Sequence, residues 1–331
     1  MMDQLIKEFS AQIREAIDIA RKAKVKPHNF PITQVVVTGL GGSGIGGDLA
    51  AEFAGDELRV PFIVNKDYFL PAFVNKNSLV IASSYSGNTE ETLKAFHQAM
   101  ARKAKVVCIS SGGKLLELAA QHKVDFIAVP GGNPPRACLG YSLVQQLYVL
   151  HYLMLIPDTF EADLLAAVEL LDNAEQQIQE EAKKIAAQLK GKIPVIYTTT
   201  PMASVAVRFR QQLNENSKML AWHHVIPEMN HNELVGWREK RPELGVIFLR
   251  NNNDYPRNQQ RIEISKEIIS KYCDTILDIY SKGNSNIERA LYLIHLTDWV
   301  SYYLAEIRNM DAVEVQVIDF LKGSLSKQPI A

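Results

Sequence analysis

Short apolar runs rich in β-branched residues alternate along this chain with segments of helical periodicity. The first runs cover residues 34–38, 60–64, 78–82, 106–109 and 126–129. Strands that alternate with helices form parallel sheets covered on both faces, because each connection between parallel strands must cross the sheet. The pattern restarts at residues 193–198, 244–249 and 275–279. The sequence therefore predicts an α/β protein built from two doubly wound parallel-sheet units.

The length of the chain agrees with such a duplication, because 331 residues exceed what one hydrophobic core usually serves. We predict a division into an N-terminal helix over 1–26, a first domain over 27–157, a linking helix over 158–190 and a second domain with C-terminal helices over 191–331.

Three helices outside the repeated pattern carry further expectations. Asp158, with Glu161 three residues later, matches a capping box at the start of the linking helix. The segment 286–308 is apolar over much of its helical circumference, which predicts burial between domains or subunits. The tail 313–321 fits either strand or helix periodicity, and we predict a helix.

The composition limits the class of partner. The formal net charge of -1 provides no basic field for nucleic acid or an anionic membrane surface. The three cysteines are far apart and show no CxxC spacing, which fits neither a disulfide framework nor a zinc site. No apolar run has the length of a signal sequence or a membrane span. We therefore predict a cytoplasmic protein.

A loop rich in hydroxyl groups lies between the run at 78–82 and a helical segment that begins near Thr92. It contains Ser84, Ser86 and Thr89, with Gly87 allowing a tight turn. Hydroxyls at a helix N-terminus, where unpaired N–H groups point outward, are typical of a phosphate site. The alternative is that these residues only cap the helix. One cap needs one such residue, so we favour a phosphate site.

Two more loops follow strands of the first unit, at 39–48 and 131–136. The carboxyl ends of parallel strands lie at one edge of a sheet, so all three loops should converge there. Gly39, Gly41 and Gly44 also match the dinucleotide fingerprint G-x-G-x-x-G, and Asp67 could bind a ribose. That nicotinamide interpretation leaves the hydroxyl loop without a role. Two hydroxyl-bearing loops suit a phosphorylated sugar better, and we predict no cofactor.

The second unit has Arg250 and three asparagines where the first has its serines, so we predict that only the first unit binds phosphate.

Five motifs occur in order along the chain. They are Gly41-Gly42-Ser43-Gly44, Ser84–Thr92, Pro135-Arg136, Asn214-Glu215-Asn216 and His231–Trp237. Together they resemble the bifunctional phosphoglucose/phosphomannose isomerases, a family built from two flavodoxin-like sugar isomerase (SIS) domains. The resemblance covers nearly the whole chain.

The resemblance implies a set of site residues. The phosphate-binding positions fall on Gly42, Ser43, Ser84, Ser86 and Thr89, and the catalytic positions fall on Glu215, His231, Arg136 and Lys322. The match at Lys322 is looser than the others, because the family usually has a proline where Ala312 follows Asp311. It also implies a metal-independent reaction and a homodimer with shared active sites, since the histidine typically comes from the neighbouring subunit.

These residue types suit the interconversion of glucose 6-phosphate or mannose 6-phosphate with fructose 6-phosphate. A carboxylate such as Glu215 can move a proton between C1 and C2 through a cis-enediol. Arg136 can stabilise the enediolate oxygen, and His231 can help open the sugar ring. Each also has a plain alternative: Glu215 as a surface acid beyond a helix, His231 in a polar loop, and Arg136 as a bridge between helix ends.

Other functions remain as alternatives. A non-catalytic sugar-phosphate sensor is one, although no helix-turn-helix segment precedes residue 33. A nicotinamide-dependent oxidoreductase is another. A zinc site at His223, His224, His231 and Glu233 is a third, although the ligand spacing is irregular.

Overall fold

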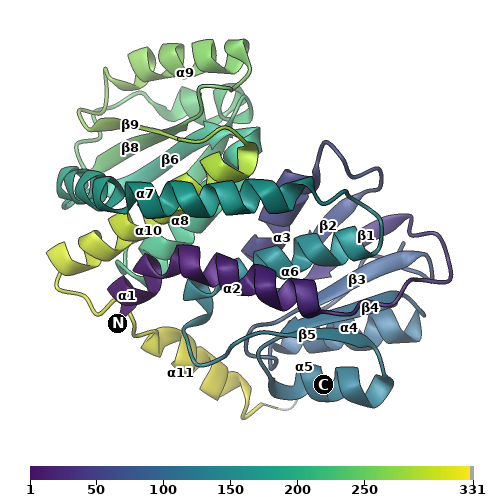
Figure 1. Cartoon of the computed structure of the whole chain (residues 1–331). Coiled ribbons are helices and arrows are strands. Elements are labelled where there is room, and N and C mark those ends of the chain that lie inside the picture. Colours follow the sequence, from purple (N-terminus) through teal and green to yellow (C-terminus); the bar gives the residue numbers. More distant parts are fainter. Residues whose placement is uncertain (329–331) are drawn as a thin grey trace.

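The computed structural model describes residues 1–328 and contains two parallel sheets joined by a layer of helices (Figure 1). The strands are β1 (Gln34–Thr38), β2 (Phe62–Asn65), β3 (Ser78–Ser83), β4 (Lys105–Ser110), β5 (Asp125–Ala128), β6 (Ile193–Thr199), β7 (Trp222–Ile226), β8 (Leu244–Arg250) and β9 (Ile276–Tyr280). Every strand pair is parallel. The predicted fold class is confirmed.

The helices follow the alternation expected from the sequence. They are α1 (Met2–Lys7), α2 (Phe9–Lys22), α3 (Gly41–Ala54), α4 (Glu90–Ala101), α5 (Gly113–His122), α6 (Leu139–Tyr152), α7 (Thr159–Gln188), α8 (Ala203–Glu215), α9 (Pro256–Ile269), α10 (Asn286–Ile307) and α11 (Gln316–Leu325). Short 3-10 turns are η1 (Pro135–Ala137), η2 (Thr200–Met202), η3 (Glu228–His231) and η4 (Glu233–Gly236).

The first sheet has the strand order β2-β1-β3-β4-β5, which is the flavodoxin-like order. Its central strands are buried on both faces, as parallel strands covered by helices require. Along β1, Val35 and Val37 face the large core toward α3 and α6, whereas Val36 faces the smaller core beneath α4 and α5. A strand without polar alternation is therefore explained by its two apolar surroundings.

The second sheet has the order β7-β6-β8-β9, so it repeats the first four strands of the first sheet. By this correspondence α8 is the counterpart of α3, because each follows the first strand of its unit. No strand was predicted at the position of β7. β7 is an edge strand in which only Ile226 is buried, so it lacks the apolar run that revealed the other strands.

The large hydrophobic core lies between the two sheets and belongs to both units. It is formed by α2, α3, α6, α7, α8 and α10 together with one face of each sheet. α10 is buried along nearly its whole length and packs along α7, as its apolar circumference predicted (Figure 1). Because the core is continuous, the two units are held in a fixed relation to one another.

Two local predictions were wrong. The predicted single N-terminal helix is interrupted at Glu8, between α1 and α2. The predicted capping box at Asp158 does not form, because the Glu161 carboxylate instead bonds Arg21 and Tyr148. A capping box does form at the start of α10, where Ser285 and Glu288 bond each other's backbone.

Candidate active site

The hydroxyl loop lies directly between β3 and α4, at the carboxyl edge of the first sheet. Ser84 Oγ is 2.8 Å from Thr89 Oγ1 and accepts from Gly87 N–H at 3.2 Å. Ser86 Oγ is exposed and accepts from Asn88 N–H at 3.3 Å. Thr89 precedes α4, but its side chain makes no capping hydrogen bond. The capping alternative therefore does not account for these hydroxyls.

The glycine loop is in direct contact with the hydroxyl loop. Ser43 Oγ accepts from Tyr85 N–H at 3.2 Å. A Cβ atom on Gly39 would lie 2.7 Å from the carbonyl oxygen of Ser83, and one on Gly42 would lie 2.7 Å from that of Pro135. Glycine is therefore required here so that three chain segments can approach one another. The predicted convergence of the three loops at one edge is confirmed.

A fourth loop, at 110–114, was missed by the sequence analysis. Ser110 and Ser111 both donate to the carbonyl oxygen of Tyr85, at 3.4 and 2.7 Å. At the N-terminus of α5, the amides of Lys114 and Leu115 donate to Asn88 Oδ1 and to the carbonyl oxygen of Gly87. The α5 terminus therefore fixes the hydroxyl loop. Its only sequence signal was the Ser-Ser-Gly-Gly run after β4.

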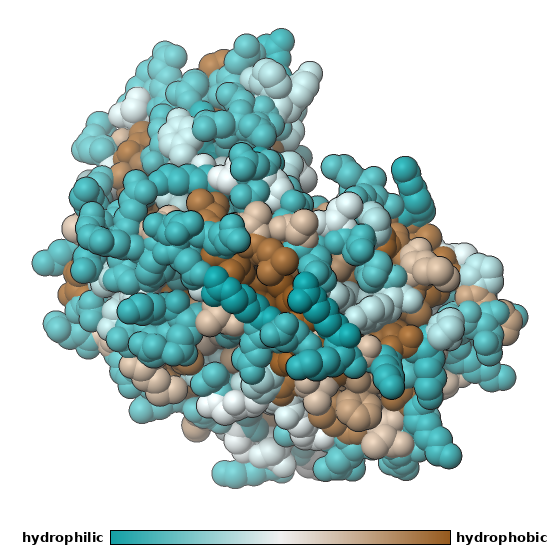
Figure 2. All heavy atoms as spheres, viewed as in Figure 1, coloured by the Kyte–Doolittle hydropathy of each residue, from teal (hydrophilic) through white to brown (hydrophobic). Residues whose placement is uncertain are grey.

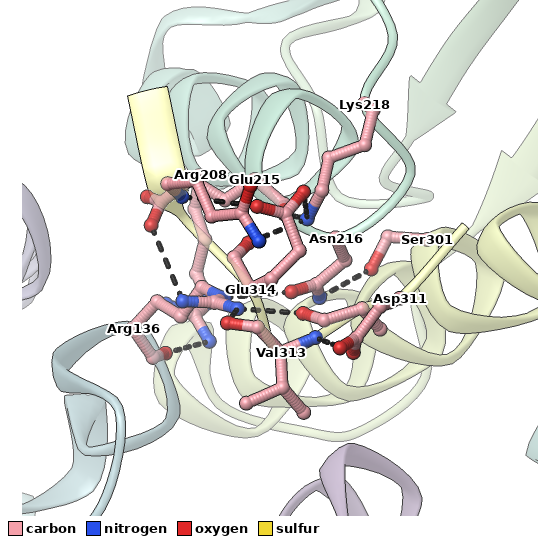
Figure 3. Close-up of polar contacts among 11 residues, drawn as sticks. Arg136, Arg208, Glu215, Asn216, Lys218, Ser301, Asp311, Val313 and Glu314 are labelled. Carbon is pink, nitrogen blue, oxygen red and sulfur yellow. Dashed lines mark hydrogen bonds and ion pairs between the residues drawn. The ribbon is translucent and has the colours of Figure 1, made fainter. Parts of the chain in front are cut away.

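Arg136 extends from η1, beside the glycine loop, toward the second unit (Figure 3). Its Nε donates to Asn216 Oδ1 at 2.7 Å, and its Nη2 donates to the carbonyl oxygens of Ala312 and Val313 at 2.6 and 2.9 Å. Nη1 lies 3.6 Å from Glu215 Oε2. Burial lowers the pKa of this guanidinium, while Glu215, Asp311 and Glu314 oppose the shift. Arginine stays protonated under such conditions.

Glu215 is the last residue of α8, not a residue beyond the helix as we had expected. Its side chain is 30% exposed, whereas that of Arg136 is 5% exposed. The carboxylate can therefore meet a ligand while its cation stays buried. The structure thus brings Arg136 and Glu215 together from two different units, as Figure 3 shows.

Lys218 and Glu314 are two further members of this cluster that sequence reasoning missed. Lys218 Nζ donates to the carbonyl oxygens of Glu215 and Glu314 at 2.5 and 2.8 Å and lies 3.5 Å from Glu314 Oε1. Together with Arg136 it ties the segment 312–314 to the end of α8. Neither residue stood in a recognisable motif, so no signal could have found them.

A cavity of about 340 Å³ opens beside Glu215. It is lined by the end of α8, by Lys218 and by the segment 314–318 that leads into α11. That volume is at the lower end of the range for small-molecule sites. Another cavity of about 340 Å³ lies around His151 and Pro157, and no predicted site residue lines it.

His231 lies beyond the carboxyl ends of the strands of the second sheet, at the end of this sheet opposite to Glu215. It ends η3, which follows the carboxyl end of β7, whereas α8 runs back across the sheet to place Glu215 near the start of β7. The five residues of β7 alone span about 16 Å. His231 is exposed and has no side-chain hydrogen bond within residues 1–328. One chain therefore does not bring His231 and Glu215 together.

Lys322 lies on α11, all of whose side chains are at least partly exposed. It makes no side-chain hydrogen bond or ion pair within the described part of the chain. The same helix exposes Val317, Phe320 and Leu321 at 83%, 78% and 57%. In Figure 1, α11 lies apart from the α7–α10 pair. A single chain thus leaves both Lys322 and this apolar face without a partner among residues 1–328.

No group of three histidine, cysteine, aspartate or glutamate side chains within residues 1–328 is arranged to hold a metal ion. In the histidine-rich segment, Glu233 accepts from Tyr197 Oη at 2.5 Å and from Trp222 Nε1 at 3.0 Å. Burial and the nearby Arg210 and His224 lower the pKa of His223.

Within residues 1–328 no helix has the length and apolar character of a membrane span.

The family model and two relatives that match this chain are described as phosphoglucose isomerases. The bacterial phospho-glucose isomerase C-terminal SIS domain matches residues 178–325. The bifunctional phosphoglucose/phosphomannose isomerase of Caldicellulosiruptor bescii is 40% identical over 336 residues, covering 98% of this chain and 99% of the relative. The enzyme of the same name from Aquifex aeolicus is 39% identical over 300 residues, covering 90% of this chain and 92% of the relative.

Solved structures resemble the fold at lower sequence identity. The C-terminal domain of glucosamine-fructose-6-phosphate aminotransferase from Francisella tularensis superposes with a TM-score of 0.75 at 14% identity, covering 95% of this chain and 98% of that one. A hypothetical protein from Thermus thermophilus gives 0.77 at 17% identity, covering 97% of this chain and 89% of that one. These likenesses concern the fold alone.

Proposed function

The chain belongs to the bifunctional phosphoglucose/phosphomannose isomerase family, and we propose that it interconverts glucose 6-phosphate and mannose 6-phosphate with fructose 6-phosphate. The observation that carries the proposed mechanism is the Arg136–Glu215 pair, formed across two units beside the glycine and hydroxyl loops. A partly exposed carboxylate facing a buried cation suits proton transfer at carbons next to a developing oxyanion.

The substrate phosphate would bind at the rim of the first sheet, to Ser43, Ser84, Ser86 and Thr89 and to the backbone at Gly42. Ser84 and Thr89 now bond each other, and both hydroxyls can turn toward an anion because a hydroxyl both donates and accepts. The open N-terminus of α4 adds amide donors and partial positive charge. Several weak donors together would fix the phosphate and hence the sugar chain.

Glu215 would act as the base that moves a proton between C1 and C2, and Arg136 would stabilise the enediolate oxygen. Three of the five N–H groups of Arg136 are bonded to Asn216, Ala312 and Val313. The two on Nη1 have no hydrogen-bond acceptor among residues 1–328, and Nη1 itself lies 3.6 Å from Glu215 Oε2 (Figure 3). A substrate oxygen between the two side chains would receive them.

His231 would reach this site from a second copy of the chain, where it would assist ring opening. Three observations support a homodimer: His231 and Glu215 lie at opposite edges of one sheet, His231 is exposed, and α11 exposes an apolar face. Lys322 on α11 would join the same shared site. The cytoplasmic location stays a prediction, which the buried free thiols of Cys108, Cys138 and Cys273 suit.

The reaction is tested by proton NMR of the purified protein with fructose 6-phosphate in deuterated buffer containing EDTA. We expect glucose 6-phosphate and mannose 6-phosphate to appear, with deuterium at C2, and the absence of conversion would overturn the proposal.

The shared site is tested by mixing Glu215→Gln with His231→Ala after dissociation and reassociation. We expect each variant to be inactive alone and the heterodimer to have one intact site, so about a quarter of wild-type activity should return. Recovery of none would contradict sharing.

A further inference from the structure

The carboxylate of the partly buried Glu52 joins the two units at a place remote from the candidate active site. Glu52, in the last turn of α3, accepts from the backbone N–H of Ser204 at 2.9 Å and from its hydroxyl at 2.6 Å. Both bonds end on Oε1, and Oε2 is buried without a partner among the described residues. Burying a carboxylate costs free energy, so this contact is not explained by stability alone.

The opposite ends of the same two helices meet at the candidate site. Gly42, at the start of α3, lies against Pro135 and Arg136, and Arg136 reaches Glu215 at the end of α8. Glu52 near the end of α3 meets Ser204 near the start of α8. The two helices therefore run side by side in opposite directions, as counterparts in a duplicated architecture would around a local two-fold axis.

The helices match in length between these contacts. At 1.5 Å per residue, Gly42 and Glu52 are separated by about 15 Å, and Ser204 and Glu215 by about 16 Å. At one end α3 and α8 are hydrogen-bonded directly through Glu52 and Ser204, and at the other end Arg136 lies between Gly42 and Glu215. Helices linked at both ends in this way resist sliding along one another. The contact between Glu52 and Ser204 therefore sets how far along α3 the end of α8 lies, and so the distance from the phosphate loops to Glu215.

We propose that Glu52 is a positioning residue for the isomerase reaction, holding α8 in register with α3 so that Glu215 stands over the reacting carbons of a substrate held by its phosphate. This inference rests on the proposed function. Glu52 itself touches neither substrate nor Glu215. Such register matters because a displacement of about 1 Å at a reacting group can lower a rate by about a hundredfold.

Three substitutions separate the hydrogen bonds from the charge. Glu52→Gln keeps an oxygen that can accept both bonds from Ser204. Glu52→Ala removes both, and Ser204→Ala removes the hydroxyl but keeps the backbone donor. Asp56→Asn is the matched control, because Asp56 is exposed near the same end of α3 and makes no side-chain bond within residues 1–328.

The kinetic test measures kcat and KM for fructose 6-phosphate on folded protein. We expect kcat to fall at least tenfold in Glu52→Ala and about threefold in Ser204→Ala, with KM within threefold of wild type because the phosphate loops are untouched. Glu52→Gln should keep kcat within about twofold, and Asp56→Asn should match wild type. Unchanged kcat in folded Glu52→Ala, or in Ser204→Ala should the first variant not fold, would overturn the proposal.

Hydrogen exchange gives a reading that does not depend on activity. In Glu52→Ala, amides over 203–215 should exchange faster than in wild type, while those over 83–92 should not change. Equal exchange over 203–215 would overturn the positioning role. If the wild-type protein shows no turnover, the proposed function fails, and the exchange result still decides whether Glu52 holds α8.

Discussion

The carboxyl edges of the two sheets have the same arrangement of strands and helices but carry different polar side chains. At the edge of the first sheet, Ser84, Ser86 and Thr89 stand around an uncapped helix N-terminus. At the edge of the second, Asp254 occupies the turn and accepts from Thr199 at 2.7 Å. Arg250 is neutralised there by Glu263 and Asp278, at 2.8 and 3.0 Å. One edge offers donors to an anion, whereas the other pairs Thr199 and Arg250 with its own carboxylates.

The difference teaches that the duplicated fold provides two equivalent edges, while the loop residues decide what each edge does. Burial raises the pKa of Asp254, and a carboxylate at that position repels phosphate. Under the proposed function, the second unit would instead contribute Glu215 from the end of α8 and His231 from η3. Hydrophilic residues cover most of the face shown in Figure 2, where the two units form separate lobes.

The largest expected effect is at Glu215, which lies at the end of α8 in the second unit and faces Arg136 of the first. Glu215→Gln should lower kcat by about a thousandfold or more, because an amide cannot accept the C1 or C2 proton. The inhibition constant of inorganic phosphate should stay within about twofold. Glu169→Gln, an exposed change on α7, is the control, and NMR turnover the measurement. Substantial turnover in Glu215→Gln would show that another group is the base.

Arg136→Lys should lower kcat by about a hundredfold and reduce thermal stability. A lysine ammonium keeps the charge but cannot reach Asn216, Ala312 and Val313 in the same geometry as a guanidinium. Arg257→Lys, at an exposed position of α9, is the control. Kinetics and melting curves would be measured together. Wild-type kcat with only a lower melting temperature would make Arg136 a structural bridge.

A matched pair of substitutions compares the two edges directly. Ser86→Ala should raise KM for fructose 6-phosphate by about tenfold, since the loss of one charge-assisted hydrogen bond costs about 1.5 kcal/mol. Asn252→Ala, at the corresponding exposed turn of the second sheet, should leave KM unchanged. Equal effects at the two positions would contradict the assignment of phosphate to the first edge alone.

The smallest expected effect on activity is that of Glu52→Gln, whose main expected effect is on stability. Burial raises the pKa of Glu52 to about 7, with Ser204 opposing the shift and Asp48 adding to it. A raised carboxyl pKa means that the native state binds the proton more tightly, so stability present below pH 4.5 is lost as pH rises toward 7. Denaturant unfolding at pH 5 and 8 should show Glu52→Gln gaining about 2 kcal/mol relative to wild type. No difference between the two pH values would show that Glu52 titrates normally.

Much of the fold was predictable because each unit repeats local signals. Apolar β-branched runs identified eight strands, and the ninth, β7, was missed because an edge strand buries little. The candidate phosphate loop was suggested by hydroxyls and a glycine within a few positions. Lys218 and Glu314 could not be found, since they belong to no motif and meet through contacts between segments distant in sequence.

The sequence by itself determined two duplicated parallel-sheet units, a hydroxyl-rich loop before α4 and the motifs of one isomerase family. These properties depend on residues close together in the chain, whose periodicity and turn chemistry act locally. Only the tertiary structure decided that Arg136 faces Glu215, that His231 lies at the opposite edge from Glu215, and that Glu52 bonds Ser204. Those relations depend on how the two units pack through their shared core, which no local pattern records.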